Sequence, residues 1–116
     1  MTWTTIRLEL ARTPAFPNGS AARSYVMRLP LGPDGRIDEQ EYRHHPEYAT
    51  VRRFWPNEPD RHGHLLRTAE GWALTYNPHE APYRLEATMI RSGSHLTLIE
   101  PGGEGMPFEV KAVGSI

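Results

Sequence analysis

The sequence predicts an all-β fold: a small antiparallel β-barrel or β-sandwich of about eight short strands, with one short α-helix at about residues 39–45. Two observations support this prediction. Apolar and polar residues alternate in short runs along most of the chain, which is typical of strands with one buried face. Turn-forming residues separate the runs, and 11 prolines and ten glycines are spread through the chain. The length of 116 residues predicts one domain, residues 1–116.

Eight segments have the alternation of a strand. They are residues 4–12, 24–31, 50–55, 64–68, 72–76, 83–90, 95–100 and 106–112. The clearest hairpin joins 64–68 to 72–76 through a loop that ends at Gly71, because glycine readily adopts the positive φ of a tight turn. Residues 56–63 lie before this hairpin and are predicted to form a polar loop.

In two of the late strands the alternation also predicts which side chains point inward. These are Tyr83, Leu85, Ala87 and Met89 in the first, and Met106, Phe108, Val110 and Ala112 in the second. Between the second and third strands, Asp38 is a suitable N-cap and Glu41 follows three residues later, as in a capping box. Pro46 limits this helix to about two turns, so we expect it to cover one end of a sheet or barrel.

Composition excludes several classes of protein. The chain has no cysteine, which excludes disulfides and cysteine-bound metal centres. The net charge of −1 argues against a nucleic-acid partner or an anionic membrane surface. The sequence has neither a continuous apolar run of about 18 residues nor the apolar core of a secretory signal, so we expect a soluble, cytoplasmic protein. Twelve of the 13 basic residues are arginine, which suggests a GC-rich bacterial genome.

One cluster of residues suggests ligand binding. Arg53 and Trp55 share a face of their predicted strand, and Arg67 and Tyr76 lie in the neighbouring hairpin. An arginine beside an aromatic ring can hold a carboxylate or phosphate while the ring packs against an organic body. The alternative is structural: arginine side chains cover aromatic edges and pair with nearby carboxylates. We take Arg53, Trp55, Arg67 and Tyr76 as candidate ligand-binding residues.

A second cluster suggests a metal site. His62 and His64 are two residues apart, so both would point to the same face of a strand, and Asp60 could supply a third ligand. Such a set could hold zinc, iron or nickel. The alternative is a hydrated loop end with two solvated imidazoles.

These observations leave three functional hypotheses. The first is a non-catalytic binding or interaction module for a small anionic or aromatic ligand or a protein partner. The second is an enzyme, either metal-dependent through His62 and His64 or a small-barrel isomerase or hydrolase. The third is an assembly protein that acts through strand-edge or homodimer contacts. The sequence has none of the common catalytic motifs, so the catalytic residues are unknown, and nothing in it requires a cofactor.

Overall fold

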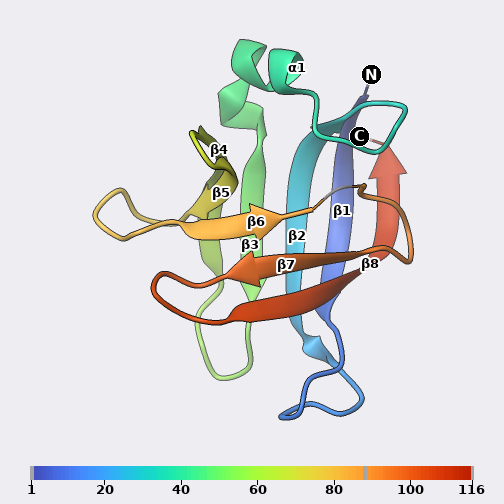
Figure 1. Cartoon of the computed structure of the whole chain (residues 1–116), viewed down its shortest axis with the longest axis vertical. Coiled ribbons are helices and arrows are strands. Elements are labelled where there is room, and N and C mark those ends of the chain that lie inside the picture. Colours follow the sequence, from blue (N-terminus) through green and yellow to red (C-terminus); the bar gives the residue numbers. More distant parts are fainter. Residues whose placement is uncertain (1, 88, 116) are drawn as a thin grey trace.

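The computed structural model describes residues 2–87 and 89–115, which form a closed barrel of eight antiparallel strands (Figure 1). Each strand pairs with the next one along the chain, and β8 pairs with β1 to close the barrel. The strands are β1 (Thr2–Leu10), β2 (Ser20–Leu31), β3 (Thr50–Phe54), β4 (Arg61–Thr68), β5 (Gly71–Thr75), β6 (Tyr83–Glu86), β7 (His95–Ile99) and β8 (Gly105–Ser115). The predicted all-β fold is confirmed, and of the two predicted architectures it is the barrel.

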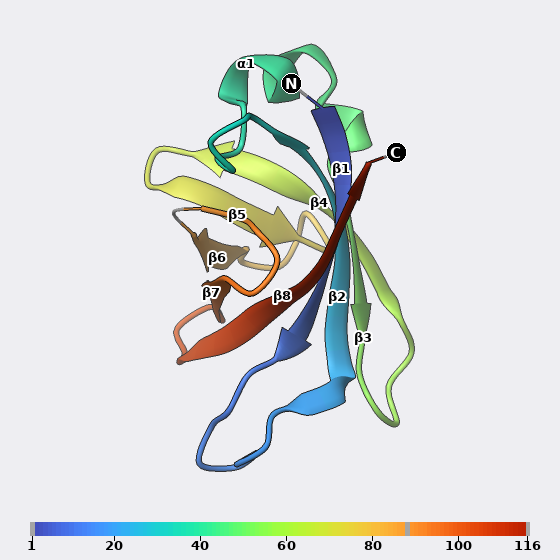
Figure 2. The same cartoon turned by 90° about the vertical axis from the view of Figure 1, so that its right-hand side faces the viewer.

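The connection between β2 and β3 covers one end of the barrel (Figures 1 and 2). It contains α1 (Glu39–His44) and the 3₁₀ turn η1 (Pro46–Tyr48). The predicted N-cap is confirmed, because the Asp38 carboxylate accepts a hydrogen bond from the Glu41 backbone N–H at 3.0 Å. The predicted capping box is wrong in its reciprocal half: the Asp38 N–H donates to the Pro30 carbonyl, and the Glu41 carboxylate accepts from Trp3 Nε1. The Tyr42 hydroxyl donates to the carbonyl of Leu65 in β4, at 2.9 Å, and so attaches α1 to the barrel. No helix in the described residues is both long and apolar enough to cross a membrane.

Inward-pointing side chains fill the barrel interior, as expected for eight strands. The alternation in the sequence predicts most of these positions correctly. The fully buried ones include Ile6, Leu8, Tyr25, Met27, Leu29, Val51, Leu65, Leu74, Leu98, Phe108 and Val110.

The predicted loop over residues 56–63 is wrong in its last three residues, because β4 begins at Arg61. Gly63 lies inside this strand, at a buried position on its inner face. A Cβ atom there would lie 2.2 Å from the Thr75 carbonyl oxygen and 2.9 Å from the Tyr76 ring. Glycine at this position therefore allows β4 to lie close to the end of β5.

Two other inward predictions are partly wrong. The predicted strand 83–90 ends at Glu86, and both Ala87 and Met89 are exposed; Thr88 lies outside the described residues. In β8 the register with β1 shifts between Arg7 and Leu8, so Ala112 is exposed instead of buried. A bulge of this kind reverses the alternation beyond it.

The end of the barrel opposite α1 is called the mouth here. Four connections lie at this end because the strands alternate in direction: residues 11–19, 55–60, 76–82 and 100–104. Figures 1 and 2 show the first two of them extending away from the barrel on the side opposite α1.

Candidate functional site

The mouth contains a buried arginine. Val51 and Arg53 of β3 point inward, and Arg53 is only 9% exposed. Its Nη1 donates to Glu58 Oε1 at 3.2 Å, whereas its buried Nε has no hydrogen-bond partner among the described residues. Its guanidinium carbon lies 4.2 Å from the centre of the Trp55 ring. Buried charges normally have their hydrogen bonds satisfied, so this arginine is an exception that needs an explanation.

Two tyrosines lie beside this arginine. Tyr25 is directly opposite Arg53 in the β2–β3 register, and its hydroxyl accepts a hydrogen bond from the Tyr76 hydroxyl at 3.2 Å. Burial raises the pKa of Tyr25, an effect that the positive charge of Arg53 partly opposes. Burial also raises the pKa of Tyr76 well above its ordinary value, and the neighbouring Tyr25 raises it further. Both phenols therefore stay protonated at neutral pH and add no negative charge beside Arg53.

A mainly apolar groove is connected to the arginine through Trp55, and Arg12 and Glu104 are the charged residues in its lining. It has a volume of about 460 Å³, and its walls include Leu10, Phe16, Trp55 and Met106. Trp55 is thus shared between the groove and the arginine site. The same indole packs against the barrel core, since it contacts the rings of Tyr25 and Phe108 with centroid distances of 6.5 Å.

A second arginine lies against the same aromatic wall. The register of β1 with β2 jumps from the pair Glu9–Ser24 to the pair Leu10–Ser20, so residues 21–23 form a bulge at the mouth. The guanidinium carbon of Arg23 in this bulge lies 4.2 Å from the Phe16 ring centre and 5.8 Å from that of Trp55. Within the described residues its side chain has a hydrogen bond to the Ser20 hydroxyl, at 3.2 Å, and no ion pair with a carboxylate.

The structure brings three of the four predicted ligand-binding residues together. Arg53 and Trp55 are in direct contact, and Tyr76 joins them through Tyr25. Arg67 lies near the end covered by α1, where its Nε donates to Glu39 at 2.6 Å and its guanidinium carbon is 5.3 Å from the Trp72 ring centre.

The structure gives the predicted metal site no support. His62 and His64 are both exposed on the outer face of β4, as their spacing predicts. Asp60 forms an ion pair with Arg52, with 4.0 Å between Oδ2 and Nη2. In the part of the chain that the structure describes, no three His, Cys, Asp or Glu residues are grouped so that they could hold a metal ion.

Sequence reasoning missed several residues of the mouth. The contact of Tyr25 with Arg53 depends on the register of β2 with β3, which the alternation within a single strand does not give. Arg23 and Phe16 belong to a bulge and a loop, where alternation gives no information. Glu58, a carboxylate near the predicted arginine cluster and an alternative to Asp60 as a third metal ligand, pairs with Arg53, which matches the structural alternative for that cluster.

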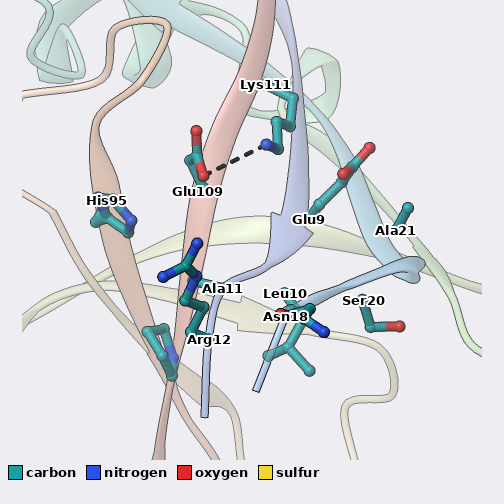
Figure 3. A pocket seen from close by; sticks show the side chains of 12 residues that line it. Glu9, Leu10, Ala11, Arg12, Asn18, Ser20, Ala21, His95, Glu109 and Lys111 are labelled. Atoms are coloured by element: carbon teal, nitrogen blue, oxygen red, sulfur yellow. Dashed lines mark ion pairs between the residues drawn. The ribbon is translucent and has the colours of Figure 1, made fainter. Parts of the chain in front are cut away.

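A second hollow, on the outside of β1, β7 and β8, is polar (Figure 3). Its volume is about 550 Å³, and its charged side chains are Glu9, Arg12, Glu109 and Lys111. Glu109 pairs with Lys111 at 3.4 Å, and Glu9 pairs with the nearby Arg7 at 3.3 Å. Arg12 and His95 also line this hollow, but they are exposed, and no aromatic ring other than the imidazole of His95 is present. The mouth is therefore the stronger candidate, because it combines a buried charge with an apolar wall.

The fold and the site define a class: an up-and-down β-barrel with one end covered by a helix, and with a buried arginine and an apolar groove at the other. No family model, curated protein or solved structure matches the chain.

Proposed function

We propose that this protein is a non-catalytic binding module for a small organic carboxylate with an apolar body, which it holds at the mouth of the barrel. One observation carries the proposal. Arg53 is nine-tenths buried, its Nε lacks a partner among the described residues, and its carboxylate partner belongs to an exposed loop.

The charge at the mouth supports an anionic ligand. Arginine stays protonated at every physiological pH, so Arg53 always carries a positive charge. A buried charge is costly unless an opposite charge or several hydrogen bonds compensate it. The two neighbouring tyrosines are neutral. Glu58 is 50% exposed, so water screens its negative charge and weakens its attraction to Arg53. A ligand carboxylate would supply the missing charge in a drier position and could accept two hydrogen bonds from the guanidinium.

The groove supports an apolar body on that ligand. Its volume lies in the range of small-molecule sites. The indole of Trp55 forms one wall and the ring of Phe16 another, and both rings also contact arginine. A ligand with its carboxylate at Arg53 would thus extend along Trp55 into the groove.

Isothermal titration calorimetry with 4-phenylbutyrate tests this proposal, and the uncharged 4-phenylbutyramide serves as the matched ligand. The wild type should bind the carboxylate and bind the amide at least tenfold more weakly. Arg53→Met keeps the length and packing of the side chain but removes its charge, so it should abolish this preference. Arg52→Met is the control, because Arg52 directly precedes Arg53 on β3 and is exposed on the opposite face.

Three results would contradict the proposal: no binding of the carboxylate by the wild type, equal binding of the two ligands, or unchanged preference in a folded Arg53→Met variant. If Arg53→Met does not fold, Arg53→Lys replaces it. This variant keeps the charge but loses the planar donor fork, so it should bind the carboxylate several-fold more weakly while binding the amide as the wild type does.

The other functional hypotheses receive less support. In the closed barrel each strand has a neighbour on both sides, which leaves little backbone for strand-edge assembly. The tyrosines at the mouth have raised pKa values and stay protonated at neutral pH, so the arrangement suits recognition better than proton transfer. We place this function in the bacterial cytoplasm, a proposal supported by the absence of cysteine and the abundance of arginine.

A further inference from the structure

We propose that Glu58 is a built-in competitor for the carboxylate site: it occupies Arg53 in the free protein and is displaced when a ligand binds. This inference rests on the proposed function and extends it, because it names the residue that sets the affinity. Glu58 already places a carboxylate oxygen 3.2 Å from Arg53 Nη1. The position that a ligand carboxylate needs is therefore held by a carboxylate of the chain itself.

The loop that carries Glu58 can release it at little cost. Residues 55–60 connect β3 to β4, and the turn is closed by a long hydrogen bond from the Glu58 N–H to the Trp55 carbonyl, at 3.4 Å. Asn57 adopts a positive φ of 61°, a conformation that asparagine tolerates better than most residues. The Glu58 side chain is half exposed, so its carboxylate would move into water and not into another buried environment.

Displacement is more favourable than joint binding. The guanidinium of Arg53 is buried on most sides, so a ligand carboxylate that reaches it along Trp55 would lie close to the carboxylate of Glu58. Two carboxylates so close repel each other strongly where water is scarce. Because Glu58 is tethered a few residues from Arg53, it competes at a high effective concentration and lowers the apparent affinity of any carboxylate ligand.

Glu58→Gln tests this inference, since it keeps the shape of the side chain and removes its charge. The matched control is Glu80→Gln. Glu80 is likewise 50% exposed, lies in another connection at the mouth, and forms an ion pair with Arg61 at 2.9 Å. Both variants and the wild type are titrated calorimetrically with 4-phenylbutyrate and with 4-phenylbutyramide, after thermal unfolding has verified that each is folded.

The expected result is that Glu58→Gln binds the carboxylate about fivefold more tightly than the wild type does, the factor expected for losing one partly exposed ion pair. Affinity for the amide should stay unchanged in this variant, and Glu80→Gln should match the wild type for both ligands. Equal or weaker carboxylate binding by Glu58→Gln would overturn the inference. If the wild type and Arg53→Met differ as proposed while Glu58→Gln matches the wild type, only the competitor role fails. If neither the wild type nor Glu58→Gln binds the carboxylate, both the proposed function and the competitor role fail.

Discussion

Arg53 and Trp55 are two residues apart on one face of β3 and its continuation, and the guanidinium carbon of the first lies 4.2 Å from the ring centre of the second. The strand period places both side chains on the inner side of the barrel. Trp55 is therefore shared by the site of the buried charge and the open groove. This pair is the link between the two halves of the proposed ligand, its anionic head and its apolar body.

Replacing Trp55 should weaken the binding of the carboxylate and of the amide alike, whereas replacing Arg53 should weaken the binding of the carboxylate. Trp55→Ala removes a groove wall, so binding of 4-phenylbutyrate and of its amide should each weaken by about tenfold, the effect of ~1–2 kcal/mol of aromatic contact. Calorimetric titration measures both affinities. Trp72→Ala is the control, because Trp72 contacts Tyr42 of α1 at the other end of the barrel. Loss of carboxylate binding alone in Trp55→Ala would contradict the role of the indole as a wall for the apolar body.

The two buried tyrosines predict a loss of stability at high pH. Because the pKa of Tyr76 is raised in the folded protein, the folded state keeps a proton that the unfolded chain releases above about pH 10. The contribution of this phenol to the free energy of unfolding is therefore complete below about pH 9. It falls as the pH rises further, by up to about 1.4 kcal/mol per pH unit for each such group.

Urea unfolding at pH 8, 10 and 11 checks this dependence. Tyr76→Phe should lose less stability between pH 8 and 11 than the wild type, since one of the two raised groups is gone. Tyr48→Phe, a substitution on the exposed outer surface, should follow the wild type. Identical pH profiles for the wild type and Tyr76→Phe would show that burial of this phenol does not affect alkaline stability.

Gly63 should be the most sensitive glycine of the barrel wall. Gly63→Ala places a methyl group against the backbone of Thr75 and the ring of Tyr76, so the free energy of unfolding should fall by about 3 kcal/mol. Gly114→Ala in β8 is the control: its Cβ would have no atom within 4 Å, and loss of glycine flexibility should leave stability equal or slightly higher. Chemical denaturation of both variants measures the difference. A Gly63→Ala variant as stable as the wild type would mean that β4 and β5 can separate locally without cost.

Most of the fold could be predicted from the sequence, because alternation and turn residues are local signals. The capped helix after Asp38 and the shared face of Val51, Arg53 and Trp55 are examples. The errors occur where contacts with distant parts of the chain, and not the local sequence pattern, determine the structure. A bulge reverses the alternation at Ala112, and pairing with Val51 of β3 makes Gly63 part of β4.

The candidate site was predictable only in part, for the same reason. Arg53 and Trp55 are neighbours in one strand, so their contact follows from strand geometry. Tyr25 meets Arg53 only through the pairing of β2 with β3, and Phe16 reaches Trp55 through the long connection 11–19. Arg67 is near these residues in the sequence, but the eight-residue strand β4 runs from the mouth to the end covered by α1 and places Arg67 near that other end.

A crystal structure of the protein with 4-phenylbutyrate tests the central claim most directly. We predict a carboxylate oxygen at about 3 Å from the guanidinium of Arg53, with Glu58 turned away into solvent and the phenyl ring against Trp55. A phenylbutyrate bound elsewhere, for example with its carboxylate at Arg12 in the polar hollow, would contradict the claim. So would a mouth that stays empty with Glu58 still paired to Arg53 at a saturating ligand concentration.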